Sequence, residues 1–249
     1  MFLSLVIPCF NETDSITQMH EQLSAIRPEL ERRGTFELVL VDDGSSDDTF
    51  HQLSASFATW DNVTVVKHDR NRGLGQALRT GFTYARGEIV VTTDSDGTYP
   101  FTTIPAMLDL LTPGIDIVTA SPYHPHGGVD GVPAYRLVFS KGASLLYRIL
   151  LDPELHTYTA MYRAYRREVI ERIPTTADGF LMVTELLVNA LLVGYHAAEF
   201  PAVLRVRQYG QSKAKVWRIM RSHLRFQAQV LRRRIGMMAR PAPHPRGTL

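Results

Sequence analysis

The sequence predicts an α/β protein with a mostly parallel sheet that helices cover on both faces. Short, β-branched apolar runs alternate with amphipathic stretches throughout residues 1–120. These runs are almost continuously apolar, as is typical of parallel strands that are buried on both faces. A chain of 249 residues, 45% of them hydrophobic, is also long enough to bury a large core in one main domain.

The first half of the chain repeats a strand followed by a helix. Strands are expected at residues 3–7, 37–41, 63–67, 88–93 and 116–120. Helices are expected at residues 15–33, 47–58, 74–86 and 103–111. Parallel sheets with this β-α-β-α order bind their ligands beyond the carboxyl ends of the strands.

The second half is less regular. A loop rich in glycine, proline and histidine at 121–133 precedes a helix near 136–150, a strand near 158–164, a helix near 181–193, a strand near 198–206 and a basic helix from residue 212. We therefore divide the chain into a main domain (1–211), a basic amphipathic helix (212–238) and a disordered tail (239–249) that is rich in proline.

Charge is unevenly distributed along the chain. Residues 1–199 hold 25 acidic and 15 basic side chains, a net charge of −10, whereas residues 200–249 hold 12 basic and no acidic side chains, a net charge of +12. The ordinary composition excludes disordered, collagen-like and disulfide-scaffold proteins. The single cysteine, Cys9, cannot form an internal disulfide, which favours a reducing cytoplasmic setting.

We expect no membrane-spanning helix. The amino-terminal residues lack the positive region of a secretory signal. The longest apolar stretch, residues 180–198, contains Glu185, Asn189 and His196, and a carboxylate near the middle of a spanning helix costs about 3 kcal/mol. The sequence therefore predicts a buried helix of a globular domain at this position.

Two acidic clusters follow predicted strands. In the run Asp42-Asp43-Gly44, Asp42 is the candidate for a hydrogen bond with the base or ribose of a nucleotide, while Ser46 or Asp47 could cap the next helix. Asp94 and Asp96 follow the strand at 88–93, and their charges repel each other unless a cation offsets them. Because Mg²⁺ binds one or two carboxylates together with phosphate oxygens, the pair indicates a metal–diphosphate site rather than a solvated turn.

A glycine loop lies between these clusters. Gly73 and Gly75 follow a strand and precede a helix, but the third glycine of the dinucleotide fingerprint is missing. Such a loop can seat phosphates through its backbone N–H groups or can be a plain turn.

The string around Asp94 and Asp96 also resembles the first motif of haloacid-dehalogenase-type phosphatases. In that family the first aspartate is a covalent nucleophile and the second is an acid or base. The lysine and adjacent acidic pair that follow the motif in that family are not matched after Asp96, where no two acids are adjacent. A phosphatase therefore remains an alternative interpretation.

A longer series of motifs resembles glycosyltransferase family 2. In order they are Val6-Ile-Pro-Cys-Phe-Asn-Glu12, Val41-Asp-Asp-Gly-Ser-Ser-Asp-Asp-Thr49, the glycines of residues 71–81, Asp94-Ser-Asp96, Asp116-Ile-Val, Ser140-Lys-Gly-Ala-Ser-Leu-Leu, Tyr162-Arg-Ala-Tyr-Arg-Arg-Glu168 and Arg207-x-x-Gly-x-Ser-Lys213. They cover residues 3–215 and are similar to the polyprenyl-phosphate branch, to which dolichol-phosphate mannose synthase belongs. The resemblance implies a GT-A fold, which is Rossmann-like, and an inverting sugar transfer.

The resemblance also implies residue roles. The nucleotide sugar would contact Pro8, Glu12, Asp42, Gly73, Gly75 and Asp94. Asp94 and Asp96 would hold Mg²⁺ or Mn²⁺, which stabilises the leaving nucleoside diphosphate. A lipid-phosphate acceptor is already an anion, so it needs cations, and the matching ones are Arg136, Arg207 and Lys213.

Glu185 matches a family carboxylate on a helix. It either faces the site or holds a buried polar network. A hydroxyl acceptor in polysaccharide or glycolipid synthesis would need a general base, and Glu185 is then the first candidate. With Asp94, Asp96 and Arg136 it completes the expected catalytic set.

Departures from the family pattern leave the sugar and the acceptor open. Pro122 stands where the family has an arginine between Ser121 and Tyr123, and Thr98 replaces a glutamine near the metal. The family's acidic pattern before the matching arginine appears here as Thr157-Tyr-Thr-Ala-Met-Tyr-Arg163. A non-catalytic nucleotide-binding module remains a further alternative.

The basic helix carries two expected faces. One groups apolar side chains: Val216, Met220, Leu224, Leu231 and Ile235, with Trp217 at the edge. The opposite face groups Arg218, Arg221, Arg225 and Arg232. The apolar face either packs on the domain or lies on a membrane surface. We expect peripheral binding at the cytosolic face of the membrane, leave open a separate membrane-protein partner, and expect no nucleic acid.

Overall fold

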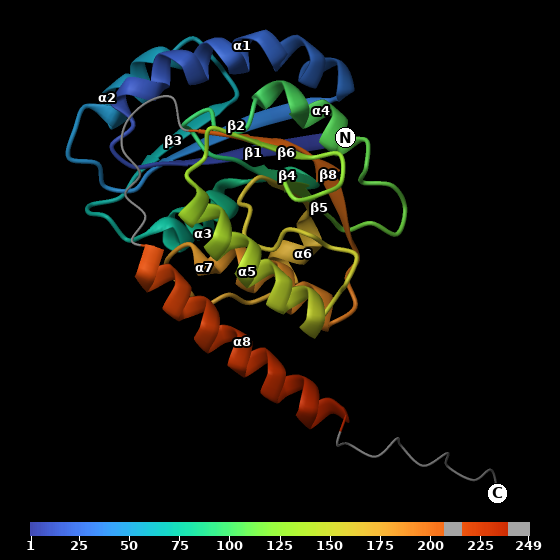
Figure 1. Ribbon diagram of the computed structural model, residues 1–249. Helices are drawn as coiled ribbons and strands as arrows, with labels where there is room; N and C mark the ends of the chain where they lie inside the picture. Colours follow the sequence, from blue (N-terminus) through green and yellow to red (C-terminus); the bar gives the residue numbers. More distant parts are fainter. Residues whose placement is uncertain (207–215, 239–249) are drawn as a thin grey trace, which may run out of the picture.

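The computed structural model of the protein describes residues 1–206 and 216–238. A seven-stranded sheet with the order β3-β2-β1-β4-β7-β5-β8 forms its centre (Figure 1). Its strands are β1 (Phe2–Cys9), β2 (Thr35–Asp42), β3 (Val63–Lys67), β4 (Ile89–Thr92), β5 (Ile117–Ser121), β7 (Arg163–Arg166) and β8 (Ala197–Pro201). All neighbouring pairs are parallel except those of β7, which runs antiparallel to β4 and β5.

Helices cover both faces of this sheet (Figure 1). One face carries α1 (Ile16–Arg33), α2 (Thr49–Ser56) and α4 (Ile104–Leu108), with short 3-10 turns at Thr13–Ser15 and Phe101–Thr103 before α1 and α4. The other carries α3 (Leu74–Tyr84), α5 (Ala134–Leu150), α6 (Arg167–Arg172), α7 (Leu181–Leu192) and α8 (Val216–Met238). The predicted fold class, a mostly parallel sheet between two layers of helices, is confirmed.

Alternation along β1 explains the two layers. Leu5 and Ile7 are fully buried in the same core cluster as α1, whereas Val6 between them is buried in a cluster with Ala77 and Leu78 of α3. Successive side chains of a strand point to opposite faces, so one apolar run contributes to two cores. This explains why the sequence shows continuous rather than alternating hydrophobicity.

The register brings three strand ends to one edge of the sheet. Cys9 at the end of β1 pairs with Asp42 at the end of β2, and Val6 pairs with Thr92 at the end of β4. The segments that follow these strands therefore lie beside one another, and they carry the acidic clusters of the sequence.

Several elements of the second half differ from the predictions. The strand expected near 158–164 begins only at Arg163, and α6 was not expected. The strand expected near 198–206 is split at Ala202 into β8 and β9 (Val203–Arg205), which belong to different sheets. Strand β9 pairs with β6 (Gly128–Asp130) inside the predicted loop, and the Gly128 amide donates a 3.1 Å hydrogen bond to the Ala202 carbonyl between β8 and β9.

Helix α8 packs on α5 and α7, but through a different face from the predicted apolar one. His223, Phe226, Gln227 and Val230 are buried, while Trp217, Leu224, Leu231 and Ile235 stay exposed. The tail expected at 239–249 lies outside the described residues. Within residues 1–206 and 216–238, none of the helices combines the length and the apolar character that crossing a membrane requires.

Candidate active site

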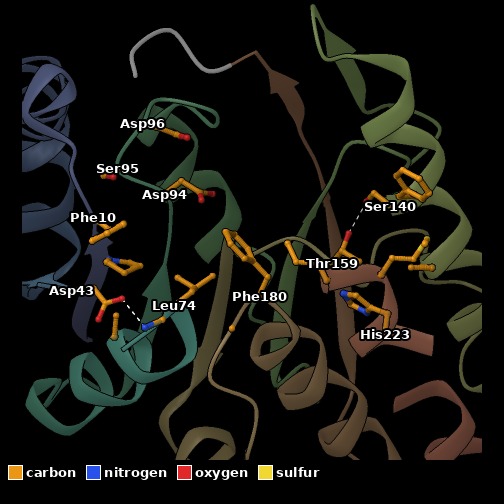
Figure 2. A pocket seen from close by; sticks show the side chains of 18 of the residues that line it. Phe10, Asp43, Leu74, Asp94, Ser95, Asp96, Ser140, Thr159, Phe180 and His223 are labelled. Carbon is orange, nitrogen blue, oxygen red and sulfur yellow. Dashed lines mark hydrogen bonds between the residues drawn. The ribbon is translucent and has the colours of Figure 1, made fainter. Parts of the chain in front are cut away.

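A cavity of about 700 Å³ opens where β1, β2 and β4 end (Figure 2). Residues that follow the strands line one wall: Pro8, Cys9, Phe10, Glu12, Asp43, Asp94, Ser95 and Asp96. The loop before α3 contributes Asn71, Gly73 and Leu74. Helices α5 and α8 supply most of the opposite wall: Val138, Phe139, Ser140, Leu146, Ile219, Met220, His223, Leu224 and Gln227. The cavity is therefore acidic along the strand ends and mainly apolar along the helices.

Asp94 and Asp96 lie together on the acidic wall (Figure 2). Strand β4 ends at Thr92, and both side chains in the following turn are half-buried. The Oδ1 atom of Asp96 accepts hydrogen bonds from the amide of Thr98 at 3.0 Å and from its hydroxyl, which fixes the orientation of this carboxylate. Burial, together with the neighbouring Asp94 charge, raises the pKa of Tyr99, so this phenol stays neutral beside the acids.

The donor set on this wall fits a divalent cation. Asp94 and Asp96 offer hard carboxylate oxygens at the edge of a cavity large enough for a diphosphate, and Mg²⁺ prefers one or two carboxylates with its other positions filled by phosphate oxygens and water. Mn²⁺ suits the same ligands. Asp94 and Asp96 could therefore hold such an ion.

Of the expected nucleotide contacts, Pro8 and Glu12 line the cavity, but Asp42 does not. Asp42 is completely buried at the end of β2. Its Oδ1 accepts hydrogen bonds from the Ser45 amide at 3.1 Å and from the Ser45 hydroxyl, whereas its buried Oδ2 has no partner among the described residues. Such orphaned acceptors are rare in folded proteins, and a ligand in the cavity would reach this one only if the end of β2 moved, because Asp42 does not line the cavity.

Asp43, rather than Asp42, lines the cavity, and sequence reasoning did not single it out. Its Oδ1 accepts a hydrogen bond from the Arg72 amide at 2.9 Å. The same oxygen lies 2.7 Å from Nδ1 of His68. Its Oδ2 accepts from Nδ2 of Asn71 at 3.0 Å and from the Gly73 amide at 2.8 Å. Asp43 thus holds the glycine loop against the end of β2. Adjacent side chains at a strand end point to opposite sides, so the sequence indicates that one of the two acids faces the cavity. It does not indicate which one.

The two glycines of the loop differ in position. Gly73 lines the cavity with a φ of +92°, where residues other than glycine are strained. Gly75 does not line it, and a Cβ atom there would lie 2.3 Å from the carbonyl oxygen of Ala177. Its amide donates to the Asp178 carbonyl at 2.7 Å. The amides of Gly73 and Gly75 therefore both donate to protein oxygens in this structure. Gly75 allows the backbone of residues 177 and 178 to approach the loop closely.

The apolar wall contains two polar side chains from α8, neither of which the sequence indicated. Nδ1 of His223 lies 3.2 Å from the Tyr147 hydroxyl, and Gln227 donates to the Ala143 carbonyl at 3.1 Å. Burial lowers the pKa of His223 to about 4, so the imidazole is neutral near pH 7. Phe180 lies between the acidic and the apolar walls (Figure 2).

Glu185 lies outside this cavity. It is buried on α7, where Oε1 accepts a hydrogen bond from the Thr176 hydroxyl at 2.8 Å and Oε2 accepts from the amides of Thr176 and Ala177 at 2.9 Å. Of the two roles that the sequence leaves open, the structure shows the buried polar network.

The expected acceptor cations are only partly placed. Arg136 belongs to the first turn of α5, and its side chain lies outside the described part of the structure. Arg207 and Lys213 lie outside the described residues altogether. Their roles therefore remain predictions.

Comparison with known proteins identifies the family. The model of glycosyl transferase family 2 matches residues 4–174. The polyprenol monophosphomannose synthase of Mycolicibacterium smegmatis is 33% identical over 216 residues, which are 84% of this chain and 79% of the relative. The dolichol-phosphate mannosyltransferase of Pyrococcus furiosus is 30% identical over 86% of this chain, which spans only 60% of that relative.

The fold is shared with solved structures. Glucosyl-3-phosphoglycerate synthase from Mycobacterium tuberculosis, in complex with Mn²⁺ and UDP-glucose, superposes with a TM-score of 0.67 and 25% sequence identity, covering 93% of this chain and 78% of that one. The family match includes the acidic pair and leaves the phosphatase interpretation without support. The chain belongs to glycosyl transferase family 2 and is a glycosyltransferase.

Proposed function

We propose that the protein transfers a sugar from a nucleoside diphosphate sugar to the phosphate of a polyprenyl phosphate, with Mg²⁺ or Mn²⁺ and with inversion at the anomeric carbon. The observation that carries this proposal is the cavity with one acidic and one apolar wall. A soluble acceptor would need no apolar wall, whereas a prenyl chain does. The names of both curated relatives refer to mannose and a polyprenol-type lipid.

The donor would occupy the acidic wall. Pro8, Glu12 and Gly73 line the cavity and would contact the nucleotide. Asp94 and Asp96 would hold the divalent cation, which supplies positive charge to the diphosphate as it leaves. A solved structural neighbour in complex with Mn²⁺ and UDP-glucose supports this arrangement.

The acceptor would attack as an anion. One oxygen of the lipid phosphate forms the new bond to the anomeric carbon, while the bond from that carbon to the diphosphate breaks and its electron pair leaves with the diphosphate. No proton has to be removed, so no general base is required. The position of Glu185 outside the cavity is consistent with this chemistry. Arg136, Arg207 and Lys213 remain our candidates for holding the acceptor phosphate.

The lipid would reach the site from a membrane surface. Tyr135, Val138, Leu145 and Ile149 are exposed on one side of α5, at spacings of three, seven and four residues. The exposed row of α8 contains Trp217, Leu224, Leu231 and Ile235.

These two rows form a joint apolar surface. The rings of Phe139 and Trp217 lie 5.9 Å apart between their centroids, and Leu146 and Leu224 extend the surface into the cavity. We infer peripheral contact of this surface with the cytosolic face of a membrane. A membrane-protein partner could bind the same apolar surface.

A transfer assay tests the proposal. Purified protein is incubated with several labelled sugar nucleotides, Mg²⁺ or Mn²⁺, and either a polyprenyl phosphate or the corresponding polyprenol. We expect lipid-extractable label only with the phosphate acceptor and only with metal. Asp94→Ala and Asp96→Ala should each lower transfer by about 10²-fold or more, since they remove charge stabilisation of the leaving group.

Asp130→Ala serves as the matched control, because Asp130 is an exposed acid on β6 away from the cavity lining. Transfer to the polyprenol instead of its phosphate would overturn the proposed acceptor. Unchanged transfer in both acidic variants would overturn the metal site but not the acceptor.

Membrane contact is tested separately by vesicle flotation. Leu145→Glu and Ile149→Glu place charge on the apolar surface and should reduce the bound fraction. Tyr84→Glu, at an exposed residue of α3, is the control. Equal binding by all three variants would rule out this surface.

A further inference from the structure

A second recess lies on the other side of α8 from the cavity. It has a volume of about 390 Å³ and lies between α7, the segment before it and α8. Helix α8 lines the cavity with residues such as His223 and Gln227, and the recess with Arg218, Arg221 and Arg225. At about 100° per residue these two sets occupy opposite sides of the helix.

The three arginines give the recess a strong positive charge. They are spaced three and four residues apart, so they lie side by side on α8, and all three are exposed. Among the described residues none of them has a carboxylate partner, whereas arginines of the main domain pair closely, as in Arg33–Asp109 and Arg27–Glu31. The guanidinium groups are therefore available to an external anion.

One carboxylate lines the recess in the described structure. Glu185 is 6% exposed, and its oxygens accept the three hydrogen bonds from Thr176 and Ala177 described above. Those hydrogen bonds come from the segment before α7 rather than from the arginines. The recess thus presents three guanidinium groups against one carboxylate that is already hydrogen-bonded.

We propose that this recess binds the phosphate of an anionic phospholipid head group. Guanidinium groups bind phosphate oxygens in pairs of hydrogen bonds. The arginine row adjoins the exposed apolar row of Trp217 and Leu224 on the same helix, which is the order in which head groups and acyl chains meet at a membrane surface. The site deepens the proposed membrane contact, on which it rests, and is separate from the acceptor site.

Vesicle binding by matched double variants tests the site. Arg221→Gln with Arg225→Gln removes two charges from the recess. Arg232→Gln with Arg233→Gln removes two charges from exposed arginines further along α8, outside the recess. With vesicles containing phosphatidylglycerol, we expect the recess variant to bind at least about tenfold more weakly than the control variant.

On neutral phosphatidylcholine vesicles the recess variant and the control variant should bind equally. Arg221→Lys with Arg225→Lys keeps the charge but loses the planar fork, so it should fall between the wild type and the glutamine variant. Equal weakening in the recess and control variants would mean diffuse electrostatic attraction and would overturn the site.

Soluble competitors distinguish binding of a lipid head group from binding of a soluble phosphate. We expect glycerophosphate or inorganic phosphate to displace the protein from anionic vesicles only at concentrations far above those of the lipid. Tight binding of inorganic phosphate to the wild type, abolished in the recess variant, would assign the recess to a soluble anion and overturn the lipid assignment. Because vesicle binding needs no sugar transfer, these outcomes are independent of the transfer assay.

Discussion

Asp43 and Gly73 join the end of β2 to the glycine loop through a 2.8 Å hydrogen bond from the Gly73 amide to Oδ2 of Asp43. Oδ1 of this buried carboxylate accepts a hydrogen bond from the preceding amide of the loop, that of Arg72. A strand end thereby dictates the conformation of a loop about thirty residues further along, and this loop lines the cavity. The glycine loop is therefore positioned by a side chain rather than only by its own backbone preferences.

Asp43→Asn should destabilise both the fold and the loop. In the asparagine side chain an NH2 donor replaces one of the two acceptor oxygens and faces an N–H group of the protein. Two buried donors that face each other cost about 3 kcal/mol. We expect a lower free energy of unfolding in urea and weaker binding of a nucleoside diphosphate, measured by calorimetry. Asp69→Asn is the control, because Asp69 forms an exposed ion pair with Arg72. Equal loss in both variants would contradict the proposed role of Asp43.

Gly75→Ala should destabilise the protein, whereas Gly142→Ala should not. A Cβ atom at Gly75 meets the carbonyl oxygen of Ala177 at 2.3 Å, while one at Gly142 in α5 meets no atom within 4 Å. Overpacking of this kind costs about 1 to 3 kcal/mol, and alanine in an open helical position gains about 0.5 to 1 kcal/mol. Thermal unfolding of the two variants should shift in opposite directions, and a shift in the same direction would contradict this interpretation.

The sequence predicted the sheet better than the site. Five apolar runs identified β1 to β5, because strands buried on both faces leave a strong local signal. The direction of β7 was not predictable, since local pattern does not encode whether a strand pairs parallel or antiparallel. The acidic pair Asp94 and Asp96 was found because it directly follows such a run.

The helical wall of the cavity was missed for a physical reason. Its polar members, His223 and Gln227, lie on α8, and amphipathic pattern alone assigns the packing face to apolar side chains. These two are buried instead because Tyr147 and the Ala143 carbonyl provide them with partners. That depends on how α8 docks on α5, which only tertiary structure shows.

Arg163 should be essential for stability. Its completely buried guanidinium donates to the carbonyl of Tyr158 at 2.6 Å, to the hydroxyl of Thr119 at 3.0 Å and to the carbonyl of Val183. It thus ties β7, β5 and α7 together.

Arg163→Met leaves these acceptors without a donor, which should cost about 3 to 5 kcal/mol. Arg148→Met, which removes a half-buried arginine that donates hydrogen bonds only to the Pro153 carbonyl among the described residues, should change the urea midpoint far less. A similar midpoint for both variants would show that the buried acceptors find other donors.

His223 should make the protein sensitive to acid. Burial lowers its pKa from 6.5 to about 4, so the folded state resists a proton that the unfolded state accepts. Above about pH 6.5 neither state is protonated and stability is unaffected. Between pH 6.5 and 4 the free energy of unfolding falls, and below pH 4 the loss levels off at about 3 kcal/mol.

The variant His223→Gln keeps a partner for Tyr147 without this titration, so its free energy of unfolding should fall less over the same range. His51→Gln, at an exposed histidine of α2, should follow the wild-type profile. Parallel profiles for the wild type and His223→Gln would show that His223 does not stay neutral in the folded state.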